Sequence, residues 1–272
     1  MLFLRDDLAS AWRDDDPFLI AQRQQGELFR NKEGRRTLRF EIAGRGYFLK
    51  LHEGVGWTEI IKNLLQGRLP ILGARNEYDA IRALESLRID TLSTAGFGER
   101  GINPAKQLSF LVTDELRDVI SLEDFCRPWL DQPPPYGLKR NLILRVADIA
   151  RRIHNSGINH RDFYLCHFLL DTTQHIDDKS VKSTKLHLMD LHRAQIRKRV
   201  PHRWLVKDLG ALYYSALDIG LNKRDVLRFI RAYRQQRLRE IFTREGNFWR
   251  AVKERAHKIY LRDFNREPRW PL

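Results

Sequence analysis

The sequence predicts an α+β fold with two lobes, the first rich in β-strands and the second mostly helical. Two observations predict it. Alternating apolar segments with glycine-bearing turns concentrate before residue 113, and helical spacing of apolar residues dominates the later part of the chain. Strands followed by helices are typical of α+β proteins. We therefore expect an N-lobe over residues 1–113 and a C-lobe over residues 114–272.

The N-lobe is predicted to contain a hairpin, a helix and a further strand. Residues 18–52 are strand-like, and the alternating runs 37–42 and 47–51 flank a turn with two glycines, which indicates a β-hairpin. Residues 76–87 repeat apolar side chains at three-residue steps, which predicts a helix. The apolar run 108–112 predicts a buried strand.

The C-lobe is predicted to be helical apart from short strands. A turn-rich segment at 131–137 contains three consecutive prolines and precedes an amphipathic helix over 142–154, which ends at Ser156-Gly157. Short apolar runs predict strands near 168–170 and 186–189.

Composition indicates a chain that folds without disulfides or structural metal ions. With 272 residues and 42% hydrophobic content, it can bury roughly 70–75% of its unfolded surface. The two cysteines, Cys126 and Cys166, have no metal-ligand spacing, so we expect neither a disulfide framework nor a zinc site, and a reducing compartment fits best. The N-terminal segment does not resemble a secretory signal, and no apolar run approaches the roughly 18–20 residues of a membrane span. We expect a soluble protein, at most bound to a membrane surface.

Positive charge is concentrated near the C-terminus. The chain has 49 Lys+Arg against 35 Asp+Glu, a net charge of +14; residues 1–190 hold 28 against 27, and residues 191–272 hold the other 21 against 8. This asymmetry points to a polyanionic partner, whether nucleic acid, anionic lipid, phosphorylated glycan or acidic protein. A solvated basic face is the alternative.

Two carboxylates are the strongest candidates for chemistry. Asp162 lies in Asn159-His160-Arg161-Asp162, and Asp190 ends the second short strand. Carboxylates from neighbouring strand ends can converge. Phosphoryl transfer from ATP needs such a pair, one to orient the attacking hydroxyl and accept its proton and one to hold Mg²⁺ on the phosphates.

The order of motifs along the chain is that of a protein-kinase-like fold. A strand carrying Lys50 precedes a helix carrying Glu77, and a strand, a helix, the H-R-D motif and a final aspartate follow. In such a fold, Lys50 would contact the α- and β-phosphates of ATP and Glu77 would pair with it.

Two features depart from that template. His167 stands where an asparagine usually binds a second Mg²⁺. Because Mg²⁺ prefers oxygen ligands, His167 either contacts phosphate, orients Asp162 or marks a one-metal site, unless it is purely structural. A G-x-G-x-x-G loop is also missing. Gly26 and Gly34 bracket residues 27–33, which either cover the phosphates or form a plain hairpin turn.

The same residues allow two other kinds of chemistry, metal-dependent hydrolysis and thiol nucleophilic catalysis. A metallohydrolase with a metal-activated water would leave Lys50 and Glu77 unexplained; its ligands would come from His160, Asp162, His167, Asp190 and His192. A thiol nucleophile at Cys166 would need the neighbouring His167, but adjacent strand residues point to opposite faces. We expect Cys166 to be a core residue.

Four segments resemble the bacterial lipopolysaccharide core heptose(I) kinases. The resemblance implies transfer of the γ-phosphate of ATP to the first heptose of the inner core, in a protein at the cytoplasmic face of the inner membrane of Gram-negative bacteria. The segments are Gly54-Val55-Gly56-Trp57, Gly73-Ala74-Arg75-Asn76-Glu77, Gly98-Glu99-Arg100-Gly101-Ile102-Asn103-Pro104 and Asn159-His160-Arg161-Asp162-Phe163-Tyr164-Leu165-Cys166-His167-Phe168-Leu169-Leu170.

The resemblance also implies roles for single residues. Asp162 would be the catalytic base and Asp190, with His167 beside it, would belong to the Mg²⁺ site. Asp208 would brace the catalytic loop in a structural role.

Along the strand end Phe110 to Leu116, Thr113 would border the adenine pocket, and the main chain of Asp114 and Leu116 would bond the adenine edge.

The basic tail has a predicted amphipathic helix. Its apolar stripe comprises Val226, Leu227, Ile230 and Tyr233, and its cationic stripe comprises Arg224, Arg228 and Arg231. Arginine is suited to bidentate contact with phosphate. The cationic stripe would hold a lipid A acceptor with its phosphorylated core near the anionic inner membrane, at about 1 kcal/mol per charge.

The resemblance makes acyl carrier protein, which is acidic, a second candidate partner; nucleic acid is not expected. Two further functions stay open beside the one that the resemblance implies. One is a kinase for the Kdo sugar of the same core or for a protein hydroxyl. The other is a non-catalytic kinase-like module that binds anionic glycolipid.

Overall fold

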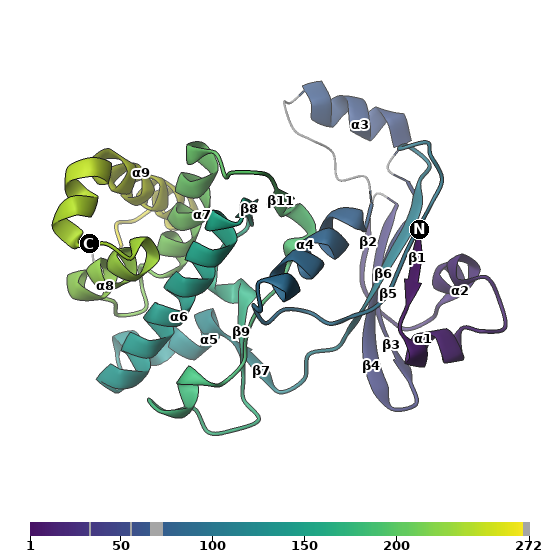
Figure 1. Cartoon of the computed structure of the whole chain (residues 1–272), viewed down its shortest axis with the longest axis horizontal. Coiled ribbons are helices and arrows are strands. Elements are labelled where there is room, and N and C mark those ends of the chain that lie inside the picture. Colours follow the sequence, from purple (N-terminus) through teal and green to yellow (C-terminus); the bar gives the residue numbers. More distant parts are fainter. Residues whose placement is uncertain (33, 55, 66–72, 269–272) are drawn as a thin grey trace. The chain divides into compact units, whose positions relative to one another are not determined.

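The structure, a computed structural model, describes residues 1–32, 34–54, 56–65 and 73–268 and divides into two compact units. The first comprises Met1–Ala83, Leu92–Arg117 and Leu191–Arg193, and the second comprises Leu84–Thr91, Asp118–Asp190 and Ala194–Leu272. The first contains a large antiparallel sheet and the second contains most of the helices (Figure 1). The predicted α+β class is confirmed.

The sheet of the first unit has six antiparallel strands in the order β1-β5-β6-β4-β3-β2. Their bounds are β1 (Leu2–Leu4), β2 (Glu27–Lys32), β3 (Arg35–Ile42), β4 (Arg45–His52), β5 (Thr94–Arg100) and β6 (Leu108–Asp114). The predicted hairpin is confirmed as β3 and β4, with Ile42 opposite Arg45. Ala43 and Gly44 form its two-residue turn, and both have positive φ, as a hairpin of matching twist requires.

Four helices accompany the sheet: α1 (Asp6–Ala11), α2 (Pro17–Arg23), α3 (Gly56–Leu65) and α4 (Arg75–Ser86), whose last residues belong to the second unit. The prediction that the strand-like region begins at residue 18 is wrong, because α2 lies there. The Asp16 carboxylate accepts a hydrogen bond from Phe18 N at 3.0 Å, and Pro17 occupies the first helical position. Both favour a helix start.

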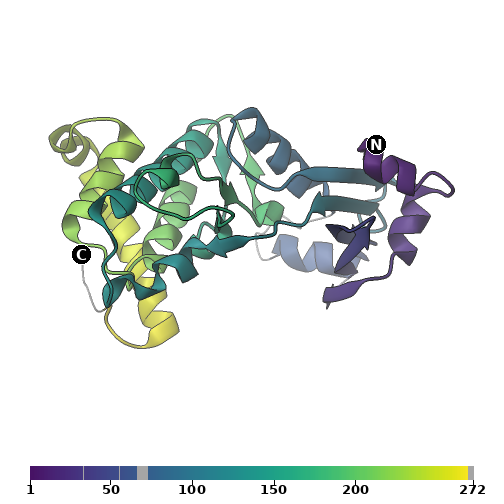
Figure 2. The same ribbon diagram turned by 90° about the horizontal axis from the view of Figure 1, so that it is seen from below.

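Helices α1 and α2 cover one face of the sheet (Figures 1 and 2). Leu8 and Phe18 from these helices pack in one buried cluster with Leu49 and Phe110 of the sheet. Successive residues of a strand point to opposite faces, so Lys50 faces away from this cluster, on the side where it meets Glu77 of α4.

The second unit contains the helices α5 (Leu122–Cys126), α6 (Tyr136–Asn155), α7 (His202–Ser215), α8 (Lys223–Arg234) and α9 (Leu238–Phe264). Strands β7 (Val119–Ser121), β9 (Phe168–Asp171) and β10 (Leu186–Leu188) form one small sheet, and β8 (Ile158–Asn159) pairs with β11 (Gln195–Ile196). Short 3₁₀ helices are η1 (Arg127–Leu130), η2 (Leu165–His167) and η3 (Ser180–Lys182); a fourth, η4 (Leu191–Arg193), belongs to the first unit.

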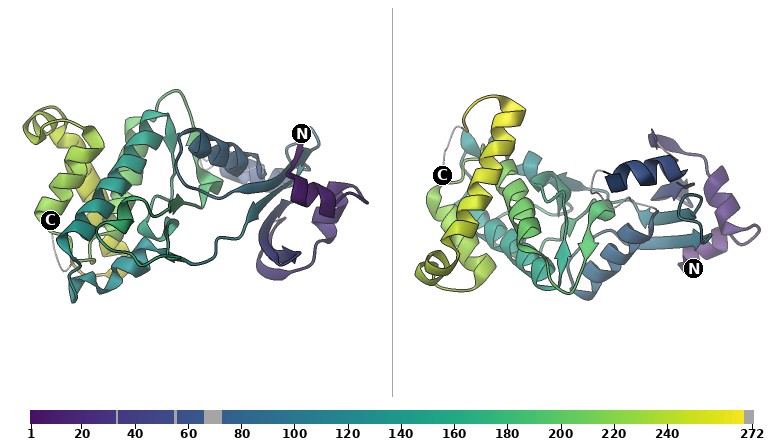
Figure 3. Two further views of the ribbon diagram at one scale, coloured as in Figure 1. Left: turned by 60° about the horizontal axis from the view of Figure 1, so that its bottom comes forward. Right: turned by 90° about the horizontal axis from the view of Figure 1, so that it is seen from above.

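Helix α9 runs alongside α7, and α8 packs against α6 (Figure 3). The helix predicted over 142–154 is present but begins earlier, at Tyr136, directly after the last proline. Residues 136–137, predicted as part of a turn, are therefore helical. A proline before a helix presets an extended residue at its entrance and does not prevent the helix that follows.

Among the helices of the described part of the chain, none combines the length and the apolar character that crossing a membrane requires.

His52 makes stability depend on pH. It is buried on β4, and burial, reinforced by the charges of Arg35 and Lys50, lowers its pKa to about 3. The ordinary pKa of histidine is about 6.5. Below pH 6.5, His52 therefore becomes protonated in the unfolded chain but stays neutral in the folded chain. Stability present above pH 6.5 is lost as the pH falls towards 3.

We expect the parent to lose about 1 kcal/mol more unfolding free energy than His52→Gln between pH 6.5 and 5.5. Urea unfolding at the two pH values measures this difference. His175→Gln, at an exposed position, should retain the pH dependence of the parent's unfolding free energy. If the unfolding free energy changed equally with pH in the parent and in His52→Gln, the assignment would be contradicted.

Candidate active site

Lys50 and Glu77 form a close ion pair within the first unit. Lys50 Nζ, on the middle of β4, donates to Glu77 Oε1, in the first turn of α4, at 2.6 Å. The Glu77 side chain is 4% exposed and that of Lys50 is 26% exposed. Glu77 thus fixes the ammonium from the buried side, and the remaining donors of Lys50 are left for phosphate oxygens. The structure contains the predicted pair; its role towards ATP stays a prediction.

The predicted adenine edge ends strand β6. Thr113 is buried and lies opposite Phe48 of β4. The Asp114 carboxylate accepts from Arg5 at 2.7 and 2.8 Å and from Arg45 at 2.9 Å. These arginines occupy the side chain, and the Asp114 amide donates to the Ser93 carbonyl oxygen at 2.9 Å. The main-chain group of Asp114 that would bond adenine is therefore its carbonyl oxygen.

Leu116 lies just beyond β6, and its main chain has no hydrogen-bond partner among the residues that the structure describes. The arrangement is compatible with the predicted main-chain contacts to adenine, which remain a prediction.

The segment predicted to cover the phosphates of ATP, or to form a plain hairpin turn, lies between Gly26 and Gly34. Residues 27–32 form β2, paired with β3. Glu33, and Val55 in the segment 54–57, lie outside the described residues. Whether this hairpin covers phosphates therefore stays a prediction.

In the second unit a buried carboxylate holds the loop that carries Asp162. Asp208, on α7, is fully buried; Oδ2 accepts from the His160 amide at 2.7 Å and Oδ1 from the Arg161 amide at 2.9 Å. His154 Nε2 lies 3.4 Å from Oδ2, and its Nδ1 lies 2.9 Å from the Tyr233 hydroxyl. The prediction that Asp208 braces this loop is confirmed.

Two residues of this region have left-handed backbone conformations. Arg161, next to Asp162, has φ 75°, and Asp190 has φ 62°. Such conformations are unfavourable for residues other than glycine and persist where the surroundings enforce them, often at functional sites. The bond from the Arg161 amide to Asp208 is one such restraint.

His167 connects the two predicted carboxylate residues. Its Nδ1 lies 2.6 Å from the Asp162 carbonyl oxygen, and its Nε2 lies 3.4 Å from Asp190 Oδ2. Because a carbonyl only accepts, Nδ1 carries the proton and donates. His167 therefore fixes the main chain of Asp162. Nε2 lies near the Asp190 carboxylate. A contact of Nε2 with phosphate or metal stays a prediction.

The site fits a metal that arrives with a nucleotide. Within the described residues, no group of three His, Cys, Asp or Glu side chains could by itself hold a metal ion. Asp190 is half-exposed and offers the hard oxygen atoms that Mg²⁺ prefers, and phosphate oxygens could complete the coordination.

The metallohydrolase alternative fits less well. His160 is buried, and its Nε2 lies 2.9 Å from the Met189 carbonyl oxygen; Nε2 must therefore carry a proton, which excludes it as a metal ligand. Burial also lowers the pKa of His160 and keeps it neutral.

The prediction that Cys166 is a core residue is wrong. It lies on η2 rather than on a strand, and its side chain is only half-buried. Burial, together with the charge of Glu123, nevertheless raises its pKa to about 11. The thiol is therefore protonated at neutral pH, which disfavours it as a nucleophile.

The cationic stripe on α8 is partly engaged within the protein. Arg224 and Arg231 are exposed. Arg228 donates to the buried Asp225 at 2.6 Å and to the Tyr136 hydroxyl at 3.1 Å. A polar hollow of about 850 Å³ lies beside the stripe, lined by Arg140, Arg228, Arg231 and Arg237 among others.

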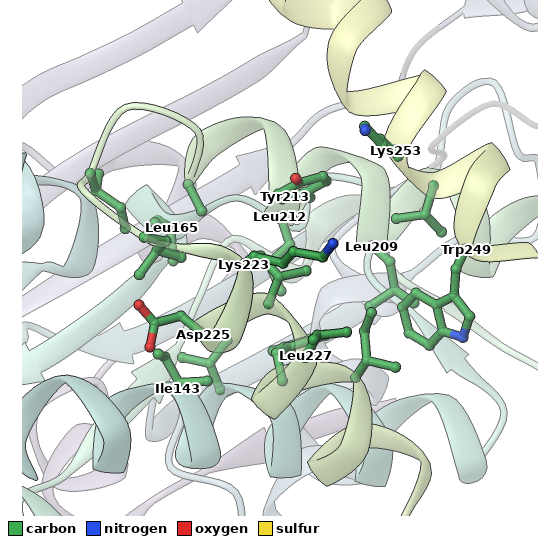
Figure 4. A pocket seen from close by; sticks show the side chains of 18 of the residues that line it. Ile143, Leu165, Leu209, Leu212, Tyr213, Lys223, Asp225, Leu227, Trp249 and Lys253 are labelled. Carbon is green, nitrogen blue, oxygen red and sulfur yellow. The ribbon is translucent and has the colours of Figure 1, made fainter. Parts of the chain in front are cut away.

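An apolar cavity of about 450 Å³ lies among the helices of the second unit (Figure 4). Leu142, Leu212 and Trp249 are among its apolar lining residues, and Lys223, Arg250 and Lys253 contribute its cations. The predicted apolar stripe of α8 supplies part of this lining: Val226, Leu227 and Ile230. The sequence alone did not reveal the cavity, because its walls come from helices far apart in the chain.

Comparison with known proteins gives consistent matches over nearly the whole chain. The family model described as lipopolysaccharide kinase (Kdo/WaaP) family matches residues 21–233. The lipopolysaccharide core heptose(I) kinase WaaP of Pseudomonas aeruginosa is 48% identical over 261 residues, 96% of each chain. The protein of the same name from Escherichia coli K12 is 47% identical and covers 95% of this chain and 97% of its own.

A solved structure is also similar, that of WaaP in complex with acyl carrier protein. It has a TM-score of 0.84 and 43% sequence identity, and the match covers 96% of this chain and 99% of the other.

Proposed function

The chain belongs to the lipopolysaccharide kinase (Kdo/WaaP) family, and on that premise we propose that it transfers the γ-phosphate of ATP to the first heptose of the lipopolysaccharide inner core. ATP use follows from the kinase family. The observation that carries the proposal is the braced loop of Asp162, fixed by Asp208 from one side and tied by His167 to Asp190. The heptose acceptor is supported by the two relatives named as heptose(I) kinases.

Asp162 acts on the acceptor in this proposal. Its carboxylate accepts a hydrogen bond from the sugar hydroxyl and takes the proton as that oxygen attacks the γ-phosphorus. The bond between phosphorus and the bridging oxygen breaks, and ADP leaves. Since phosphoryl transfer depends mainly on positioning and charge stabilisation, the fixed main chain at Asp162 is the feature that serves the reaction.

Lys50, oriented by Glu77, contacts the α- and β-phosphates. Thr113 borders the adenine, and the main chain of Asp114 and Leu116 bonds its edge.

Mg²⁺ is proposed as the metal, and Asp190 would hold it. The ion would supply charge neutralisation on the phosphate oxygens. His167 keeps the Asp162 main chain in place whether or not its Nε2 contacts the ion or a phosphate.

The proposed place of action is the cytoplasmic face of the inner membrane, where the protein is peripheral. The 21 Lys+Arg against 8 Asp+Glu of residues 191–272 and the exposed Arg224 and Arg231 support contact with an anionic surface and with the phosphorylated acceptor.

The direct test uses labelled ATP and core oligosaccharide isolated from a strain that lacks this kinase. The Asp162→Asn variant should transfer phosphate about 10²–10⁴-fold more slowly than the parent, because the hydroxyl loses its proton acceptor. Asp263→Asn, on the exposed side of α9, should stay within about twofold of the parent.

Transfer at the parent rate by Asp162→Asn would refute the role of Asp162. An acceptor that carries Kdo but no heptose, and a protein acceptor, should compete poorly with the complete core. A different result would indicate a non-catalytic module: the parent protein would turn over ATP only at the background rate, and its affinity for polyanions would fall steeply as the salt concentration rises.

We also infer that acyl carrier protein is a partner. A similar structure holds that protein, and this chain combines a basic C-terminal part with an apolar cavity beside Lys223 and Lys253. An acidic carrier would be attracted by the cations. The cavity, at about 450 Å³, would receive an acyl chain attached to the carrier.

Leu227 offers a test because it lines the cavity and is only half-buried. Leu227→Glu would place a charge where the acyl chain lies, and we expect its affinity for acylated carrier protein, measured by calorimetry, to fall at least about 10-fold. Leu261→Glu, at an exposed position of α9 outside the cavity lining, is the matched control. Parental affinity in Leu227→Glu, or an equal loss in the control, would refute this use of the cavity.

A further inference from the structure

Four cationic side chains surround a single indole ring in the second unit. Trp204, in the first turn of α7, has Lys207 Nζ at 4.2 Å from its ring centroid, Arg161 Cζ at 5.1 Å, Arg203 Cζ at 5.5 Å and Arg197 Cζ at 6.0 Å. At an exposed site each cation–π contact is weak. The four like charges also repel one another, so the ring alone does not account for their convergence.

The segment that supplies Arg197 and Arg203 contains no acidic residue. Between Asp190 and Asp208 the sequence has six lysines and arginines and no aspartate or glutamate. Arg197 donates to Asn159 Oδ1 at 2.5 Å and to Gln195 Oε1 at 2.7 Å, both neutral amide oxygens. In the described part of the chain, no ion pair involves Arg197 or Arg203. Their charge is therefore not neutralised within the cluster.

The cluster is fixed next to the proposed base. Arg161 directly precedes Asp162, and its amide donates to Asp208, the residue that follows Lys207. Asn159, which accepts from Arg197, opens the same loop. Trp204 itself is half-exposed and Arg203 is exposed. Trp204 and Arg203 thus lie on α7, the helix whose Asp208 holds the loop of Asp162, and Arg197 is hydrogen-bonded to the residue that begins this loop.

We propose that Trp204, Arg197 and Arg203 form an acceptor subsite for an acidic sugar. The guanidinium groups bind carboxylate or phosphate oxygens, for which their planar donor pairs are suited, and the apolar face of the sugar ring lies on the indole. The subsite rests on the proposed function, since it places an acidic unit of the acceptor beside the heptose that Asp162 would act on. A neutral sugar would leave the charge of the two arginines without a counterpart.

The test is the affinity of the protein for core oligosaccharide, measured by calorimetry without ATP so that no turnover is needed. Arg203→Gln and Arg197→Gln should each weaken binding at least about 10-fold, as the loss of a hydrogen bond between charged groups predicts. The matched control is Arg239→Gln, which removes the same charge at an exposed position of α9 and should bind within about twofold of the parent. Affinity for ATP should be unchanged in all three.

Chemically modified acceptors identify the anionic group. If a carboxylate is bound, carboxyl-reduced core should bind the parent as weakly as intact core binds Arg203→Gln, and the variant should lose no further affinity. If a phosphate is bound, core treated with phosphatase should behave in this way instead. The loss of affinity of the parent protein for the modified acceptors needs no variant, so this part of the test remains decisive if a variant fails to fold.

Unchanged affinity in Arg203→Gln and Arg197→Gln would overturn the subsite, as would an equal loss in Arg239→Gln, which would indicate general charge attraction. Full affinity of the parent for both modified acceptors would overturn it too. A parent that binds core with the expected variant pattern but transfers no phosphate would refute the proposed kinase function and leave the subsite standing.

Discussion

The buried carboxylate of Asp208 is the constraint on which the catalytic loop depends. A charge buried without partners would be strongly destabilising, and Asp208 is stabilised by the amides of His160 and Arg161 and by the nearby His154. These bonds fix the left-handed turn at Arg161, and the next residue is Asp162. His167 then holds the Asp162 carbonyl from the other side. The proposed base therefore sits on a main chain with few alternatives, as catalysis by positioning requires.

Helix α8 extends this arrangement towards the basic part of the protein. Its Tyr233 reaches His154, which contacts Asp208. Other residues of the same apolar stripe line the cavity, and its exposed arginines lie on another side. Helix α8 thus contacts His154 beside Asp208, lines the apolar cavity and presents arginines that would bind an anionic ligand.

Local patterns sufficed for much of the fold and of the site. Alternation and a glycine turn predicted the β3–β4 hairpin, and motif order predicted the contact of Lys50 with Glu77. The brace at Asp208 was implied by the family resemblance. The sequence failed where structure depends on distant residues or on a competing local signal. The capping by Asp16 outweighed the strand-like pattern at α2. The arginine partners of Asp114, the apolar cavity and the cations around Trp204 come from segments that only the folded chain brings together.

Hydrogen exchange of the His160 and Arg161 amides tests the central claim that Asp208 fixes the catalytic loop. In the parent protein these two amides should exchange slowly, close to the limit set by global unfolding. In Asp208→Asn, which keeps one acceptor oxygen and loses the charge, their protection should fall about 10–100-fold relative to amides within α6. Rapid exchange of both amides in the parent, or equal protection in the variant, would contradict the account.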